Sequence, residues 1–410
     1  MSAFPQVAPR TRLVFAMQQV LTVVAYGWHR IVHAHERGSV TWVVGPREIA
    51  SMVFHVAASI PGSHSVSLDR HKFYDLAYDS QLRAGDGSLR DSLRQVIVSP
   101  LLFARLANRA RGFVYLGATG FLIDAVDQRA FEFRFLRRRG RPIVCLFTGD
   151  DIRAPRLMEE LKQHSGVENL FGHYGELNDL FQSDEYDASK RRIAHVADEY
   201  AGAIINAPVD QVSYLKRPAE RFRYFFPDDK FQFVPEKFDV LEPVIVVHAP
   251  SNMAVKGTPL VRDAIERLRA EGYNIDYREL VNVSNAEVRR QLAIAHIALN
   301  QFYALMPGVF GIEAMASCCA MLASADPAVE TTLGSAAAGA WLITKHDQVY
   351  ANIKSLLDSP ESIKPLALRG FEWVKENESA SVSGRALTAL LDAVLDGSYR
   401  SGETWRPQDG

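Results

Sequence analysis

Residues 244–258 read VIVVHAPSNMAVKGT, and residues 297–317 read IALNQFYALMPGVFGIEAMAS. In each segment an apolar run is followed by a loop and then by a helical pattern. Residues 244–247 are apolar at every position, which is typical of a strand buried on both faces of a parallel sheet, and Pro250 would interrupt its ladder of hydrogen bonds. The order strand, loop, helix therefore occurs twice and indicates an α/β fold.

A lysine precedes the first of these helices. Thr258 is a good N-cap residue, so residues 260–271 are predicted to form an amphipathic helix. Lys256 then lies just before a helix N-terminus, where N–H groups and the helix dipole favour an anion. Because the ammonium adds a full positive charge, this loop is a candidate phosphate site.

A carboxylate and two glycines accompany the second helix. Glu313 is predicted in the first turn of a helix that follows the loop at residues 304–309. A carboxylate there can stabilise the helix end, or it can accept two hydrogen bonds from the diol of a ribose. Gly308 and Gly311 lack side chains where a ligand would approach the backbone. The sequence leaves both roles of Glu313 open.

These segments together resemble the donor-binding domain of GT-B glycosyltransferases, in particular the large retaining family four. The motifs that carry the resemblance are HAPSN at 248–252, KGT at 256–258 and GIEAMA at 311–316. In the N-terminal half, TGDDIR at 148–153 follows a predicted strand and is similar to the family's Gly-x-Asp-Ile-Arg segment. The resemblance extends over residues 142–380.

The resemblance implies two Rossmann-like, doubly wound domains that face each other across a cleft. It places an acceptor-side domain at residues 1–238, a nucleotide-sugar-binding domain at 239–396 and a loose tail at 397–410. The implied reaction moves a sugar from a nucleoside-diphosphate sugar to a glycan, lipid-linked or other small acceptor, with retention of anomeric configuration. The nucleotide sugar is a co-substrate, and neither a cofactor nor a divalent metal is expected.

Within that scheme the candidate residues receive roles. Lys256 is expected to stabilise the departing diphosphate, and Glu313 to hold the ribose. Asp150, Asp151 and Arg153 on the opposite rim would handle the sugar or the acceptor, although either aspartate could equally cap a helix. The donor-binding candidates are Ser251, Asn252, Lys256, Gly257, Thr258, Gln301, Gly308, Val309, Phe310, Gly311 and Glu313.

Some positions depart from the family pattern. Leu305 stands where the family has the first of two glutamates, and Thr148 stands where it often has a histidine. The arginine that often accompanies the lysine is missing near Asn252. Gln301 or backbone groups near Met306 could replace the lost sugar contact.

These departures support an alternative, a catalytically silent GT-B scaffold or partner subunit of an active glycosyltransferase. A nucleotide-sugar epimerase is a third hypothesis, which the motifs disfavour.

Strands and helices are predicted to alternate along both halves of the chain, which indicates parallel doubly wound sheets with ligands beyond the carboxyl ends of the strands. The predicted strands are 40–44, 112–116, 142–147, 203–206, 223–227, 244–247, 275–281, 297–302 and 341–344. The predicted helices include 49–59, 101–111, 131–139, 348–357, 363–376 and 385–395. The turns 45–48, 117–120 and 149–151 each follow a strand and fall on that rim, and a hinge is predicted at 235–243.

Composition agrees with an ordinary globular protein of two domains. The chain has 410 residues and a net charge of −2, so it offers no bulk attraction to nucleic acid or to an anionic membrane. Its three cysteines, Cys145, Cys318 and Cys319, form no metal-ligand spacing and no disulfide framework. A reducing cytoplasm is therefore the expected compartment, with Cys145 as a small core residue.

An apolar segment near the start of the chain has two interpretations. Residues 13–28, which begin with Leu13 and end with Trp28, are interrupted by Gln18, Gln19 and Thr22 and are short for a bilayer crossing. We expect a buried or domain-packing helix here. A peripheral contact with a membrane surface is the alternative.

Overall fold

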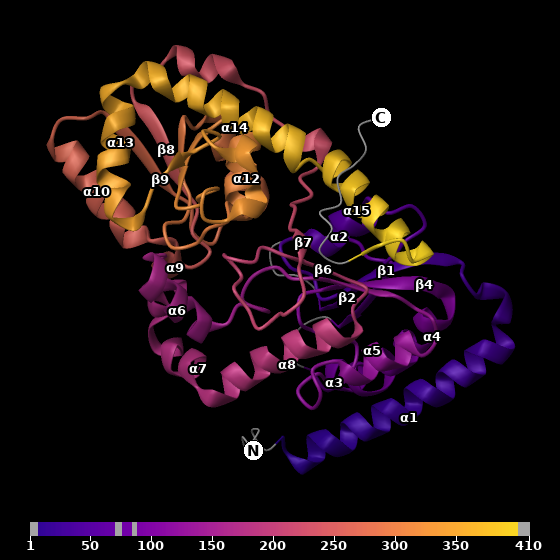
Figure 1. Cartoon of the computed structure of the whole chain (residues 1–410). Coiled ribbons are helices and arrows are strands. Elements are labelled where there is room, and N and C mark those ends of the chain that lie inside the picture. The colour runs from indigo at the N-terminus through magenta and orange to yellow at the C-terminus, as the bar shows by residue number, and fades with distance from the viewer. Residues whose placement is uncertain (1–6, 70–75, 84–87, 401–410) are drawn as a thin grey trace.

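Two separate parallel sheets form the centres of the two halves of the molecule (Figure 1). The computed structural model describes residues 7–69, 76–83 and 88–400. The first sheet has seven strands in the order β3-β2-β1-β4-β5-β6-β7, and the second has five in the order β12-β11-β10-β8-β9. The chain thus has the predicted α/β architecture of two doubly wound domains.

The N-terminal sheet is built from alternating strands and helices. Its strands are β1 Val40–Pro46, β2 His64–Asp69, β3 Ser80–Arg83, β4 Ala110–Leu116, β5 Ile143–Leu146, β6 Ala203–Asn206 and β7 Glu220–Arg221. The helices of this half are α1 Pro9–Val32, α2 Met52–Ala58, α3 Leu89–Leu93, α4 Ser99–Arg109, α5 Ala130–Arg137, α6 Pro155–Ser165, α7 Asn178–Gln182 and α8 Asp184–Tyr200, with a π-helical turn, η2, at Arg94–Val98. Cys145 in β5 is a buried core residue, as predicted.

The C-terminal sheet follows the same plan. Its strands are β8 Val244–His248, β9 Ile275–Glu279, β10 Ile297–Leu299, β11 Ala320–Ala323 and β12 Leu342–Ile343. The helices are α9 Met253–Lys256, α10 Thr258–Ala270, α11 Asn285–Ile294, α12 Gly308–Ala316, α13 Val349–Asp358, α14 Ile363–Asn377 and α15 Ala380–Asp396. The central strands are buried along their length, because helices cover both faces of the sheet.

The strand predicted at residues 223–227 is wrong. The strand at this point is β7, which ends at Arg221, and the following aromatic residues enter the core instead. The backbone N–H of Tyr224 donates to the carboxylate of Glu378 at 2.7 Å, and the N–H of Phe226 donates to the carbonyl of Glu378 at 2.9 Å. A run of buried aromatic side chains therefore resembles a strand in sequence, although Glu378 satisfies its backbone donors.

Helix α15 contacts both halves of the molecule. It leaves the C-terminal domain and extends over the N-terminal one (Figure 1), where it packs against α2. Gly384 of α15 approaches Ser59 so closely that a Cβ atom would lie 2.8 Å from the Cβ of Ser59. The bounds 1–238 and 239–396 stay a prediction, but α15 joins the two halves. Residues 401–410 of the predicted tail lie outside the described residues.

The helix near the N-terminus was expected to be buried or to pack on a domain, and the structure shows a helix that packs on the N-terminal domain without being buried. Helix α1 runs along the outer edge of the N-terminal domain (Figure 1) and packs on α4 with one face only. It buries Gln18 and Thr22 and exposes several large apolar side chains, including Val24 at 65% and Trp28 at 61%. Among the residues described, none of the helices combines the length and the hydrophobicity that crossing a bilayer requires.

Candidate functional site

A cleft of about 740 Å³ lies between the carboxyl ends of the two sheets. Its N-terminal rim is formed by the loops that follow β1, β4, β5 and β6, and its C-terminal rim by the loops after β8 and β10 and by the start of α12. All three predicted rim turns contribute lining residues. The predicted site residues that line the cleft are Asp150, Asp151, Arg153, Ser251, Asn252, Lys256, Gln301, Gly308 and Val309.

Lys256 supplies the positive charge of the C-terminal rim. It is the last residue of α9 and directly precedes Gly257, the cap of α10. Its ammonium donates to Oε1 of Gln301, and Nε2 of Gln301 in turn donates to the carbonyl of Met306 at 2.5 Å. Burial lowers the pKa of Lys256 to about 8, against the opposing effect of Asp210. At neutral pH the group is therefore a cation whose bonded partner is a neutral amide.

Two of the predicted donor-binding residues near Lys256 face inward instead. Gly257 has a φ of 78°, and a Cβ atom there would lie 3.1 Å from the ring of Phe302. Thr258 does not cap α10, because its hydroxyl bonds to Nε2 of His248 at 2.9 Å and is fully buried. His248 also contacts the carbonyl of Leu299 at 2.7 Å, and burial lowers the pKa of His248 to about 4. These side chains fix the start of α10 against the sheet.

Helix α12 starts earlier than expected, at Gly308. Gly308 has a φ of 70°, and its N–H donates to the hydroxyl of Tyr224 at 2.9 Å. Gly308 and Val309 line the cleft, whereas Phe310 packs beside a small core cluster that includes Val247. Gly311 does not face the cleft, since a Cβ atom there would lie 2.6 Å from Nδ2 of Asn300. Its small size serves helix packing rather than the approach of a ligand.

Glu313 lies in a smaller cavity, of about 50 Å³, that adjoins the cleft. The two cavities share Ala50, Met52, Tyr224 and Val309 as lining residues. Because α12 begins at Gly308, Glu313 is not in the first turn and does not cap the helix. Its carboxylate accepts a hydrogen bond from Nδ2 of Asn285 at 2.7 Å, and burial raises the pKa of Glu313. That Glu313 and Lys256 share one ligand stays a prediction.

The charges of the N-terminal rim are paired with one another. Arg153 is buried, donates through Nη1 to Asp150 and through Nη2 to Asp210 at 2.5 Å, and its Nε donates to the carbonyl of Asp210 at 2.6 Å. Burial alone would lower the pKa of Arg153, but Asp210 and Asp150 outweigh it and raise the pKa. Asp150 also accepts from the hydroxyl of Tyr174. Arg153 is thus a fixed, neutralised part of the cleft wall.

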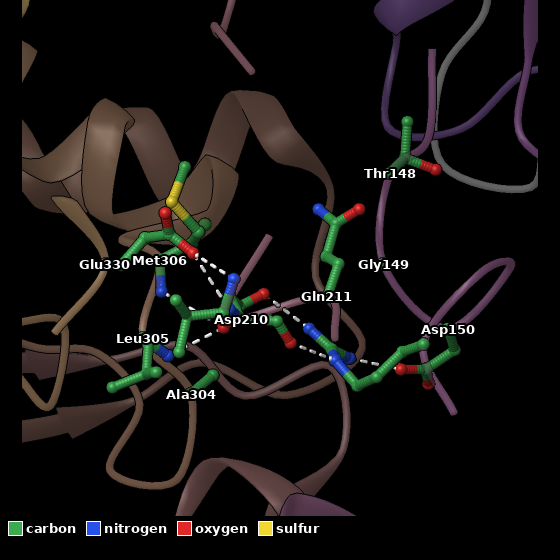
Figure 2. Close-up of polar contacts among 12 residues, drawn as sticks. Thr148, Gly149, Asp150, Asp210, Gln211, Ala304, Leu305, Met306 and Glu330 are labelled. Atoms are coloured by element: carbon green, nitrogen blue, oxygen red, sulfur yellow. Dashed lines mark hydrogen bonds and ion pairs between the residues drawn. The ribbon is translucent and has the colours of Figure 1, made fainter. Parts of the chain in front are cut away.

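Asp210 connects this rim to the C-terminal domain (Figure 2). Its Oδ1 accepts from the backbone N–H of Leu305 at 2.6 Å and of Met306 at 3.2 Å. In return, Oε2 of Glu330 accepts from the N–H groups of Val209 and Asp210, both at 2.9 Å. The loop after β6 is therefore held between two segments of the other domain. Asp210 of the N-terminal domain thus brings a carboxylate to the backbone of Leu305, the position at which this sequence has leucine in place of the family's first glutamate.

Asp151 has a structural role in this arrangement. Its carboxylate accepts from the backbone N–H groups of Thr148, Gly149 and Ile152, the last two at 2.9 Å. Burial raises the pKa of Asp151. Both carboxylate oxygens hold the loop after β5, but no helix begins there, since α6 starts at Pro155 with Ala154 as its N-cap. Asp151 therefore fixes a loop rather than capping a helix, and a role toward the sugar or the acceptor stays a prediction.

Sequence reasoning missed three residues of the site: Lys190, Asp210 and Glu330. Lys190, in the middle of α8, donates to the carbonyls of Asp150 and Asp151, and burial lowers its pKa to about 8. Nothing in the pattern of α8 distinguishes it. Asp210 could have been found, because it follows a recognised strand and so falls on the rim of the sheet. Glu330 lies in an irregular segment with no motif.

The architecture is similar to that of solved glycosyltransferase structures. Sucrose-phosphate synthase from Thermosynechococcus elongatus superposes with a TM-score of 0.55 at 13% identity, over 89% of this chain and 98% of that chain. HepE from Anabaena, solved with UDP and glucose, superposes with a TM-score of 0.52 at 12% identity, over 87% of this chain and 100% of that chain. No protein-family model and no curated protein sequence matches the chain. The superpositions, with the two parallel sheets, show that the chain has the GT-B fold.

Proposed function

We propose that this chain is a glycosyltransferase that moves a sugar from a nucleoside-diphosphate sugar to a glycan, lipid-linked or other small acceptor. The observation that carries the proposal is the partly buried ammonium of Lys256, which lines the interdomain cleft and has a neutral amide, Gln301, as its partner. A cation in this setting favours binding of an anionic ligand, because withdrawing a positive charge from water without an opposite charge beside it costs free energy. A diphosphate has the charge and size to supply that partner.

The proposed chemistry rests on positioning and charge. As the bond between the sugar and the diphosphate breaks, negative charge grows on the leaving phosphate oxygen. Lys256 would donate to that oxygen, and the N–H groups that follow Gly308 in the first turn of α12 would bind the same anion, since the N–H of Gly308 is bonded to Tyr224. Asp210 and Arg153 would hold the backbone at Leu305 in place while the sugar is bound. Retention of configuration is carried over from the resemblance to family four.

Glu313 would receive the ribose in the adjoining cavity. Its buried carboxylate retains one oxygen beyond the bond to Asn285, and a carboxylate can accept both hydroxyl groups of a vicinal diol. The shared lining residues, including Val309 and Tyr224, would let one nucleotide extend from Lys256 to Glu313.

One observation favours a second candidate, the catalytically silent scaffold. The position of the family's first glutamate is Leu305, an apolar residue that is 7% exposed, and its backbone is already bonded to Asp210. A chain with no carboxylate of its own at this point could bind a nucleotide without transferring a sugar.

Two measurements separate these functions. Calorimetry with UDP, GDP and ADP tests for binding, and chromatography of UDP-, GDP- and ADP-sugars incubated with the protein tests for slow donor hydrolysis. A glycosyltransferase is expected to bind one nucleotide and to release free sugar from the matching donor. Binding without release supports the scaffold, and the absence of binding to all three nucleotides favours the scaffold and refutes the glycosyltransferase.

A further inference from the structure

Helix α1 buries polar residues and exposes apolar ones. The residues that it buries are Phe15, Gln18, Thr22 and Tyr26. Eight large apolar side chains are exposed, with exposed fractions between 41% for Met17 and 81% for Ile31. These eight are Leu13, Met17, Val20, Val23, Val24, Trp28, Ile31 and Val32. Their spacing of mostly three and four residues places them along one side of the helix.

The rotation of α1 about its axis is fixed by the side chain of Gln18. Its Nε2 donates to the carbonyl of Gln95 at 2.8 Å, and its Oε1 accepts from the N–H of Ile123 at 3.0 Å. Tyr26 packs edge-on against Phe135 with the ring centroids 5.3 Å apart. Turning the apolar side inward would break both buried hydrogen bonds, so the outward orientation is built into the packing.

Neighbouring helices extend this apolar surface. Helix α1 packs along α4 and η2, and α3 leads directly into η2. Exposed apolar side chains on these elements range from 38% to 51% exposed, namely Leu93, Ile97, Val98 and Leu101. We call the twelve exposed side chains together the α1 face. The helix of 24 residues gives it a length of about 36 Å, well beyond a scattering of single apolar residues.

The two segments that carry the α1 face are strongly basic. Residues 7–37 and 88–109 contain eight arginines and two carboxylates, Glu36 and Asp91, whereas the whole chain has a net charge of −2. The carboxylate of Glu36 lies 3.7 Å from the guanidinium groups of both Arg105 and Arg109, so its negative charge is paired with theirs. The arginines of these two segments are Arg10, Arg12, Arg30, Arg37, Arg90, Arg94, Arg105 and Arg109.

We propose that the α1 face docks on the surface of an anionic lipid bilayer. A helix held lengthwise on the protein can insert its free apolar side into the boundary between headgroups and acyl chains, while arginines of the same segments meet anionic headgroups. A second copy of the chain is a poorer partner, because a twofold contact would bring two sets of arginine-rich segments together. The inference is independent of the proposed function, since none of the residues of the α1 face lines the cleft.

Flotation with vesicles tests the proposal. The full chain is mixed with vesicles of phosphatidylcholine alone, or with vesicles that also contain about 30% phosphatidylglycerol. Each mixture is then centrifuged through a density gradient. We expect the protein to float with the anionic vesicles, with at least about tenfold less binding to neutral ones. The double variant Val20→Glu, Val24→Glu should lower binding to anionic vesicles by at least about tenfold, since it puts two carboxylates on the apolar side.

The control is Val240→Glu, which changes an equally exposed valine, at 69%, in the linker between the domains. It should float as the unchanged protein does, and thermal unfolding should show that all variants are folded. The emission of Trp28, isolated by comparison with Trp28→Phe, should shift to shorter wavelength on anionic vesicles. The proposal is overturned if the unchanged protein does not float with the anionic vesicles, or if the double variant floats equally well. It is also overturned if the unchanged protein binds no vesicles and light scattering shows a dimer that is absent in the double variant.

Discussion

The two rims of the cleft carry charge in different ways. On the N-terminal rim Arg153 is bonded to Asp150 and Asp210, so its charge is neutralised inside the protein. On the C-terminal rim Lys256 is bonded to the neutral amide of Gln301, and its charge is left for a ligand. Charged residues that hold the structure are paired with each other, whereas Lys256 has a neutral neighbour. This difference supports the proposal that Lys256 binds the diphosphate while Arg153 and Asp210 hold the structure.

The largest effect is expected from removing the charge of Lys256. Lys256→Met keeps the length of the side chain, and we expect it to lower the rate of donor hydrolysis or transfer by about 10² to 10³, since one donor to a developing anion is lost. Chromatographic assay of the released sugar measures this rate. Lys364→Met, which changes a half-exposed lysine paired with Asp239, is the matched control. Equal rates for Lys256→Met and the unchanged protein would remove Lys256 from the mechanism.

Breaking the pairing of the N-terminal rim should act on stability. Asp210→Asn leaves Arg153 with one carboxylate partner and disturbs the bonds to Leu305 and Met306. We expect the free energy of unfolding in urea to fall by about 2 to 3 kcal/mol. Asp263→Asn, on an aspartate side chain that is 69% exposed, should leave it unchanged. If Asp210→Asn instead weakened nucleotide binding as strongly as Lys256→Met, the division of roles between the rims would fail.

The pH dependence should separate binding from stability at the same lysine. Burial lowers the pKa of Lys256 to about 8 in the folded chain, so kcat/KM should fall about tenfold for each pH unit above that value as the ammonium is lost. The contribution of Lys256 to the free energy of unfolding changes with pH in the opposite direction. Between the pKa of the folded chain and the higher pKa of the unfolded chain, the unfolded chain binds more protons, so this contribution rises with pH. A kcat/KM that stays level to pH 10, measured on protein shown to be folded, would contradict the role of Lys256.

A smaller effect is expected at Glu313. Glu313→Gln keeps an oxygen for Asn285 but replaces the free carboxylate oxygen by an amide NH₂, which donates instead of accepting. UDP, GDP or ADP should therefore bind about fivefold more weakly. Because burial raises the pKa of Glu313, removing its charge should leave the thermal midpoint unchanged or slightly higher. Glu372→Gln, on an exposed side chain, is the control. A large loss of stability would show that Glu313 is structural.

The sequence predicts the C-terminal domain well because its signals are local. The strand at 244–247 and the position of Lys256 before α10 both depend on neighbours in the chain. The start of α12 was misplaced because Gly308, at a φ of 70°, begins the helix with its N–H bonded to Tyr224, a partner 84 residues away.

The features that sequence did not reveal depend on distant contacts. The apolar side of α1 faces outward because Gln18 bonds to residues 77 and 105 positions further along the chain. Asp210 reaches Leu305 across the cleft, at a separation of 95 residues. Hydrophobic periodicity indicates that one side of a helix is more apolar than the other, but it does not indicate which side the rest of the molecule covers.

The central claim, that the ammonium of Lys256 binds a diphosphate, is tested most directly by proton uptake during nucleotide binding. Calorimetry at pH 8 in buffers of different ionisation enthalpy measures the protons taken up when UDP, GDP or ADP binds. Because Lys256 is about half protonated there and an anion would stabilise its charged form, we predict uptake of about half a proton, absent in Lys256→Met and present in Lys364→Met. Binding without proton uptake, or the same uptake in Lys256→Met, would contradict the account.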